Sequence, residues 1–123
     1  MEFELQSSRP IWQQLTEQLS RRIVTGAYPP GTRFPTVREL ATEAGVNPNT
    51  MQRAIAQLES AGLVSTNRTA GRTVTEDTAV LDAMRQQLAK ELLSSYFSEM
   101  EALGYSRAEA AAMVAAEKEE KEE

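Results

Sequence analysis

Apolar residues recur every three or four positions along most of this chain, which is the spacing of one buried face of an α-helix. The pattern covers residues 10–25, 36–44, 47–61 and 77–103. It changes between the third and fourth stretches, where the runs Leu63–Thr66 and Thr73–Thr75, rich in β-branched residues, flank a polar segment that contains glycine. Such a pair of runs is typical of a β-hairpin. The sequence therefore predicts three helices, a hairpin and one long helix.

Residue types at the ends of the second and third helices predict a short turn between them. Thr36 and Glu39 have the spacing of a capping box, in which a threonine caps the helix and a glutamate reaches back. Gly45 then ends that helix, as a glycine in the left-handed conformation does. Asn47 and Pro48 begin the next helix as its N-cap and its first residue. Two helices separated by so few residues, with a glycine between them, are the signature of a helix-turn-helix.

The third helix separates an apolar side from a polar side. The apolar side can pack against the preceding helices and consists of Met51, Ala54, Ile55 and Leu58. The polar side carries donors and acceptors suited to base edges and phosphates, on Asn49, Thr50, Arg53 and Gln57. A solvated polar face with no partner is the alternative. Because a hairpin follows, the elements form a winged helix, and in a helix-turn-helix the second helix commonly enters the DNA major groove.

The stretch from Pro10 to Val74 resembles the DNA-binding domain of GntR-type bacterial transcription regulators. The resemblance rests on many fixed positions at fixed spacing, in the segments Pro10–Gln14, Gly26–Ala41, Gly45–Thr50 and Leu58–Val64. The segment Phe97–Ser106 is similar to the C-terminal region of the small YtrA-type members. The resemblance implies a homodimer that represses or regulates its own operon, often one that encodes an ABC transporter.

The DNA contacts that we expect lie on the two helices of the motif and on the wing. They are made by Arg38, Asn47, Asn49, Thr50, Arg53, Gly71 and Arg72. The resemblance implies that Arg38 reaches the operator, and a salt bridge from Arg38 to Glu39 or Glu43 is the alternative. The planar fork of Arg53 suits guanine or a phosphate. Pro48 stands where many GntR proteins carry an arginine.

The first helix and the segment after it supply the rest of the domain. Trp12 lies beside the apolar stripe of this helix, where packing in the core or against a second subunit is favoured over stacking on a base. The segment Gly26–Gly31 is a loop rich in residues that break helices. Phe34 is then expected to form a short strand that completes a small sheet with the wing.

The long helix carries an apolar face that is broad for a small domain. Burial of this face against a second copy of the chain is favoured, and folding back on its own domain is the alternative. The dimerisation residues that we expect are Leu81, Met84, Leu88, Leu92, Tyr96 and Met100. Ser106 and Glu109 form a second capping box, which begins a short helix with Ala110, Met113 and Val114 facing inward.

Composition narrows the range of functions. The 123 residues include no Cys and no His, which removes the thiolate and imidazole metal ligands and the commonest general base. We therefore expect no metal site, no cofactor and no catalytic residue. The chain has no apolar run near the roughly 18 residues of a membrane span, and its acidic start lacks the features of a signal peptide. A cytoplasmic protein without a membrane partner is expected.

The net charge of −5 is unevenly divided along the chain. Residues 1–75 hold eight arginines and six glutamates, a charge of +2, whereas residues 76–123 hold five basic and twelve acidic residues, a charge of −7. The acidic excess thus lies away from the expected DNA-binding face, where it would repel phosphates. Because +2 is modest, the sequence predicts weak non-specific binding and reliance on a dimer.

Together these patterns predict a mainly α (α+β) fold in three parts. Residues 1–75 form the winged helix-turn-helix, residues 76–117 a two-helix dimerisation region, and residues 118–123 a disordered acidic tail. The predicted function is a sequence-specific transcription regulator, a repressor that binds a palindromic operator in double-stranded DNA as a homodimer. The alternatives are a regulator that senses a small molecule at the helical dimer interface, and a protein-interaction winged helix without DNA binding. The sequence does not identify an effector.

Overall fold

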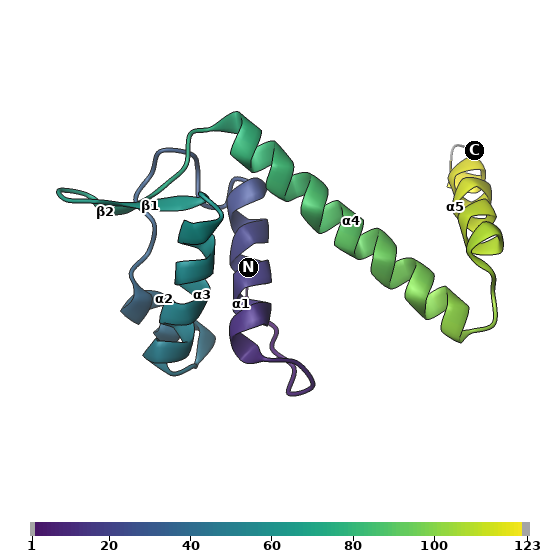
Figure 1. Cartoon of the computed structure of the whole chain (residues 1–123), viewed down its shortest axis with the longest axis horizontal. Helices are drawn as coiled ribbons and strands as arrows, with labels where there is room; N and C mark the ends of the chain where they lie inside the picture. Colours follow the sequence, from purple (N-terminus) through teal and green to yellow (C-terminus); the bar gives the residue numbers. More distant parts are fainter. Residues whose placement is uncertain (1, 122–123) are drawn as a thin grey trace. The chain divides into compact units, whose positions relative to one another are not determined.

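The computed structural model describes residues 2–121 of the chain, and the side chains of residues 2–117. The chain divides into two compact units, residues 1–86 and residues 87–123. Within the described residues, three helices are followed by a two-stranded hairpin and two further helices (Figure 1).

The three helices of the first unit lie within the predicted ranges, and capping side chains begin the second and the third. Their bounds are Ile11–Val24 for α1, Val37–Ala44 for α2 and Pro48–Ser60 for α3. The Glu39 N–H donates to Thr36 Oγ1 at 3.1 Å, and the Thr36 hydroxyl donates to the Glu39 carboxylate at 3.0 Å. The Asn49 N–H donates to Asn47 Oδ1 at 2.7 Å, which caps α3. Gly45 ends α2 with a φ of 68°, so the predicted helix-turn-helix is confirmed.

The wing is an antiparallel hairpin made of β1, Val64–Asn67, and β2, Gly71–Val74. The short strand expected at Phe34 is not formed. A single bridge joins Arg33 to Thr73 instead, and the Phe34 N–H donates to the Arg72 carbonyl at 2.8 Å. The Phe34 side chain is buried in the core, and the backbone hydrogen bonds of this segment to β2 are made by Gly31, Thr32 and Phe34.

One hydrophobic core holds the first unit together. Its members come from all three helices, the hairpin and the first turns of the next helix, and include Leu15, Leu19, Ile23, Phe34, Leu40, Met51, Ile55, Leu58, Leu63, Val64, Val74 and Leu81. α3 packs against both α1 and α2, and Figure 1 shows α1 and α3 side by side. Because the apolar side of α3 is taken by these helices, its polar side is turned outward.

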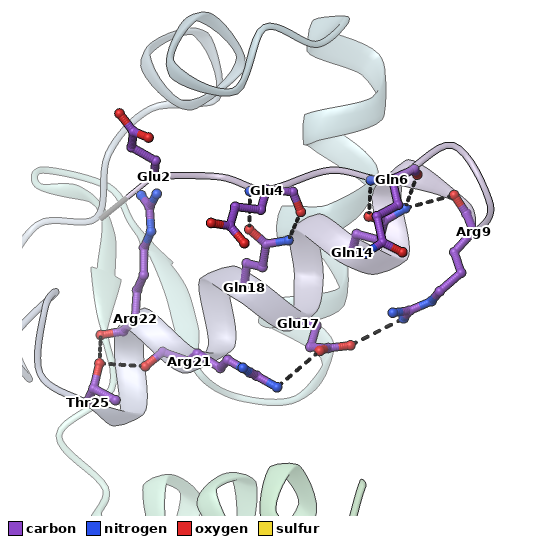
Figure 2. A pocket seen from close by; sticks show the side chains of 10 residues that line it. All are labelled: Glu2, Glu4, Gln6, Arg9, Gln14, Glu17, Gln18, Arg21, Arg22 and Thr25. Carbon is purple, nitrogen blue, oxygen red and sulfur yellow. Dashed lines mark hydrogen bonds and ion pairs between the residues drawn. The ribbon is translucent and has the colours of Figure 1, made fainter. Parts of the chain in front are cut away.

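The segment before α1, residues 2–9, is called the N-terminal arm. Two glutamines of α1 each bind both the backbone N–H and the backbone carbonyl of one residue in this arm (Figure 2). Gln14 accepts from the Gln6 N–H at 2.7 Å and donates to the Gln6 carbonyl at 2.6 Å. Gln18 pairs with Glu4 in the same way, at 3.0 Å and 2.7 Å. The paired residues alternate along the arm, and Phe3 beside them lies against the core. The arm is therefore part of the folded unit.

The two helices that follow the hairpin are α4, Thr78–Ala102, and α5, Arg107–Lys121. The predicted capping box begins α5, because the Ser106 N–H donates to the Glu109 carboxylate at 2.8 Å and the Glu109 N–H donates to Ser106 Oγ at 3.1 Å. The α5 helix extends past position 118, where the disordered tail was expected to begin. Residues 122 and 123 of that tail lie outside the described residues.

The apolar stripe expected along α4 divides in the structure. Leu81 belongs to the core of the first unit and Met84 packs against that core. Leu81 is buried and Met84 is half-buried within their own chain, so the first turns of α4 complete the winged-helix core. That these two residues also serve dimerisation stays a prediction. Leu88 is also buried, whereas Leu92 and Leu93 are 56% and 55% exposed.

The second unit buries little of its apolar surface. The Tyr96 hydroxyl donates to the Ala110 carbonyl at 2.7 Å, which joins α4 to α5 inside this unit. Tyr96 and Met100 are half-buried and Ala110 is fully buried. Met113 and Val114 do not face inward as expected and are exposed, because nothing within the described residues covers that part of α5.

Candidate nucleic-acid interface

The outward side of α3 gathers polar residues from its first turn onward. Asn49 and Arg53 are exposed, and Thr50 is half-buried. Asn47 uses its side-chain oxygen to cap the helix, and its NH₂ group stays available. Gln52 is also exposed, and reasoning from the sequence missed it, although its spacing of three from Asn49 places both on neighbouring positions of one side. Its amide offers the donor and acceptor that suit adenine.

Arg38 is exposed in the first turn of α2 and has no salt bridge with any described residue. The two carboxylates that could have held it are used elsewhere. Glu39 closes the capping box with Thr36, and Glu43 pairs with Arg22 at 2.7 Å. The alternative interpretation of Arg38 as half of a local ion pair is therefore wrong for this structure, and its charge is available to a partner outside the chain.

Arg22 connects three parts of the first unit. Its side chain is only 6% exposed, stacks on the Phe3 ring at 4.0 Å, and donates to the Tyr28 hydroxyl at 2.6 Å and to Glu43. Burial lowers the pKa of Arg22, and the hydrogen bonds to Glu43 and Tyr28 raise it by more, so the net shift is upward. The guanidinium thus stays charged and ties the arm and α2 to α1. The position of α2, which carries Arg38, depends on this link.

Arg53 has a different environment from the other arginines of the first unit. Its guanidinium carbon lies 4.1 Å from the centre of the Trp12 ring. It forms no hydrogen bond or ion pair with the described residues. Trp12 is half-buried and is not a member of the hydrophobic core, so its packing role is a contact with α3.

Of the two arginines on the wing, Arg72 forms an ion pair with a described residue and Arg68 does not. Arg72 Nε donates to the Glu59 carboxylate at 2.5 Å, which joins β2 to the last turn of α3. Arg68 lies at the tip and pairs with no described carboxylate. Asn67 Oδ1 accepts from the Thr69 N–H at 2.9 Å and organises the turn, and Gly71 takes a φ of 74° that a side chain would strain. The tip is therefore a defined turn with an available cation.

The charges around α2, α3 and the wing are arranged unevenly. The carboxylates next to this surface are engaged, since Glu39 accepts from the Thr36 hydroxyl and Glu43 and Glu59 each hold an arginine. The first unit leaves four arginines without an ion pair to the described residues, namely Arg33, Arg38, Arg53 and Arg68. A surface on which Glu43 and Glu59 are paired with arginines and four other guanidinium groups are available favours a phosphate-bearing partner.

A cavity of about 460 Å³ lies between the N-terminal arm and α1 (Figure 2). Two of the arginines that line it are paired with Glu17, Arg9 at 3.2 Å and Arg21 at 3.4 Å. Within the described residues, no group of three or more acidic side chains is placed to hold a metal ion. None of the described helices combines the length and the hydrophobicity needed to cross a bilayer.

Comparison with known proteins agrees with this geometry. The model of the family described as "Bacterial regulatory proteins, gntR family" matches residues 12–74. The chain is 36% identical over 109 residues to the uncharacterized HTH-type transcriptional regulator YhcF of Bacillus subtilis, covering 89% of this chain and 90% of YhcF. It is 29% identical over 107 residues to the HTH-type transcriptional repressor YtrA of the same organism, covering 82% of each.

Solved structures of similar proteins support the same family. A GntR family transcriptional regulator from Listeria monocytogenes matches with a TM-score of 0.77 and 38% identity, over 91% of this chain and 98% of that one. The DNA-binding domain of AraR, solved in complex with operator ORE1, matches with a TM-score of 0.52 and 31% identity, over 61% of this chain and 94% of that one. The chain therefore belongs to the GntR family of bacterial regulatory proteins, as a small YtrA-type helix-turn-helix transcription regulator.

Proposed function

We propose that this chain is a homodimeric repressor that binds a palindromic operator. Each subunit inserts α3 into the major groove, where Arg38, Asn49, Thr50 and Arg53 contact bases and phosphates. Asn47 and Gly71 stay in the proposed contact surface, at the start of α3 and on the wing, and Arg72 supports this surface by holding the wing on α3 through Glu59. Gln52 joins them because it is exposed beside Asn49.

The observation that carries the proposal is the set of available cations beside the polar side of α3. Arg38 and Arg53 form no ion pair with the described residues, while the nearby Glu39, Glu43 and Glu59 are engaged. Phosphate contacts supply much of the affinity of such proteins, and base contacts supply the sequence preference. The operator bound by the DNA-binding domain of AraR supports a DNA partner of the same kind for this chain.

Exposed leucines support the dimer. Leu92 and Leu93 are more than half exposed on α4, and Leu103 is 74% exposed. Burial of a leucine side chain contributes about 1.5–3 kcal/mol, so a second copy that covers these residues gains stability. Two subunits related by a two-fold axis contact two half-sites of opposite orientation, which is why the operator is a palindrome.

Repression and the nature of the target rest on the relatives. The similar YtrA of Bacillus subtilis is named a repressor, which supports repression here. The resemblance to small YtrA-type regulators implies an operon that the chain itself belongs to, often one that encodes a transporter. A regulator bound across a promoter represses by occupying the site that polymerase needs.

The test is a selection of bound DNA from a random pool at near-physiological salt. The full chain is expected to enrich one palindrome. Arg38→Ala and Arg53→Ala are expected to lose that enrichment, while Arg21→Ala, which removes the same charge from a side chain paired with Glu17, keeps it. A folded wild-type chain that enriches no sequence would contradict the proposal and favour a protein-interaction winged helix.

A further inference from the structure

Trp12 and Arg53 form a stacked pair that the function described so far does not use. Trp12 is the second residue of α1 and the single tryptophan of the chain. Arg53 lies in the second turn of α3, and its guanidinium carbon is 4.1 Å from the centre of the Trp12 ring. The contact joins the helix proposed to read DNA to a helix that does not belong to the helix-turn-helix.

The chemistry of this contact differs from that of an ion pair. A guanidinium that stacks on an indole uses its flat face, and its N–H donors point outward in the plane of the fork. Arg53 has no hydrogen bond or ion pair within the described residues, so those donors and the positive charge remain available.

Arg72 provides the contrast inside the same unit. Its Nε donates to Glu59 at 2.5 Å, and the carboxylate neutralises its charge. A carboxylate that pairs with an arginine fixes the side chain, but it occupies N–H donors and neutralises charge that a phosphate or a guanine would bind. An aromatic clamp fixes the side chain and leaves the donors for the partner, which is the arrangement that bidentate recognition needs.

We propose that Trp12 is a positioning residue for DNA recognition, which holds the Arg53 fork in a bound-like orientation before DNA arrives. This inference rests on the proposed function. It assigns Trp12 a role other than core packing, since Trp12 lies outside the hydrophobic core, and other than base stacking, since one ring face is covered by Arg53. Holding the long side chain in advance reduces the rotamer entropy lost on binding.

The first experiment measures the pair without DNA. Because Trp12 is the single tryptophan, its fluorescence reports its own surroundings. Arg53→Ala is expected to change the emission of the free, folded protein, and Arg38→Ala is expected to leave it unchanged. An emission spectrum that Arg53→Ala does not alter would contradict the stacked pair.

The second experiment measures affinity for the selected operator with Trp12→Leu, Trp12→Phe, Arg53→Ala and the double variant Trp12→Leu/Arg53→Ala. Trp12→Leu is expected to weaken binding about twofold to tenfold, the range of a cation–π contact, with much less effect on random DNA. Trp12→Phe keeps an aromatic face and restores most of the affinity. In the Arg53→Ala background, Trp12→Leu is expected to cost nothing further.

The outcomes separate the inference from the function on which it rests. Equal losses from Trp12→Leu with and without Arg53 contradict the inference alone, because Trp12 then acts on DNA or on stability by itself. Thermal unfolding of each variant identifies a stability effect. A folded wild-type chain that enriches no operator contradicts the proposed function, and the inference falls with it.

Discussion

The two units of this chain differ in how far their leucine side chains are buried. In the first unit Leu15, Leu40 and Leu58 are fully buried, and the helices, the wing and the first turns of α4 share one core. In the second unit Leu92 and Leu103 are more than half exposed, and among its described large aliphatic residues Leu88 is the buried one. The first unit is complete as a single copy, whereas the second leaves apolar surface that a partner can cover.

This difference separates the work of the two units. The first unit carries the surface of available arginines, and its own core fixes that surface in place. Residues 87–123, which make up the second unit, hold four basic and nine acidic residues, a net charge of −5, and the unit presents exposed leucines. We therefore propose that the first unit recognises DNA and that the second unit pairs the subunits.

The largest expected effect is the loss of stability caused by Leu58→Ala in the first unit. Leu92→Ala is the matched substitution in the second unit. Leu58→Ala leaves a cavity in a closed core and is expected to lower the free energy of unfolding by about 2–5 kcal/mol. Leu92→Ala removes exposed surface and is expected to lower the unfolding free energy of a monomer very little. Denaturant unfolding at several protein concentrations checks this, since the Leu92→Ala effect should appear only where the chain is dimeric. Equal, concentration-independent losses would contradict the contrast between the units.

A stronger change in the second unit should uncouple the subunits without unfolding the first. Leu92→Glu/Leu93→Glu places charges on the proposed dimer face and is expected to give a folded monomer. Its affinity for the full palindrome should fall about a hundredfold, because the second half-site no longer adds to the first. Sedimentation equilibrium and DNA titration measure both quantities. Gln87→Glu, an exposed polar position on the same helix, serves as the control and should change neither.

Arg38 tests the surface of the first unit. Arg38→Ala is expected to weaken operator binding by about 1–3 kcal/mol if the side chain reaches a base. Binding to operator and to random DNA should be compared at several salt concentrations, because a uniform loss with a shallower salt dependence indicates a phosphate contact instead. Arg21→Ala carries the same charge change away from the motif helices. An equal loss in both variants would show that only net charge matters.

The Glu59–Arg72 pair predicts whether operator affinity falls or rises when Glu59 is replaced. If the pair fixes the wing on α3, Glu59→Gln should weaken operator binding by about 1 kcal/mol or less, because the pair is partly exposed. If Arg72 instead binds DNA on its own, removal of the carboxylate should release it and strengthen binding. We expect the weakening, and we expect Arg72→Ala to add little once Glu59 is replaced. Titrations of the two single variants and the double variant decide between the two roles.

The smallest expected effect is a pH dependence at the start of α5. The backbone and hydroxyl hydrogen bonds from Ser106 lower the pKa of Glu109 below its ordinary value. A lowered pKa in the folded state means that the stabilisation is present above the ordinary pKa and is lost as the pH falls through the folded value. The first turn of α5 should therefore fray in acid, seen as faster relative amide exchange near Glu109. Glu109→Gln should lack that dependence.

The sequence was sufficient for elements whose cause is local. The capping boxes at Thr36 and Ser106, the left-handed Gly45 and the N-cap Asn47 depend on neighbours within a few residues, and all four are present. Local hydrogen bonds decide where a helix begins and ends, so residue type and spacing were enough to predict these features.

Features that depend on distant contacts could not be predicted from the sequence. An apolar stripe shows which face of α4 is buried but not what buries it, and Leu81 turned out to belong to the first unit's core. Arg53 and Arg72 both carried the pattern of DNA contacts, yet one stacks on an indole and the other pairs with a carboxylate. The partners Trp12 and Glu59 are brought near them only by the packed fold.

The most direct test of this division between the units is the number of chains bound to the selected operator and to an isolated half-site. Native mass spectrometry or sedimentation of the complexes measures this number. We expect two wild-type chains on the palindrome and one Leu92→Glu/Leu93→Glu chain on a half-site, with binding in both cases lost in Arg38→Ala/Arg53→Ala. A single wild-type chain that binds the full operator at full affinity would contradict the division between a unit that recognises DNA and a unit that pairs the subunits.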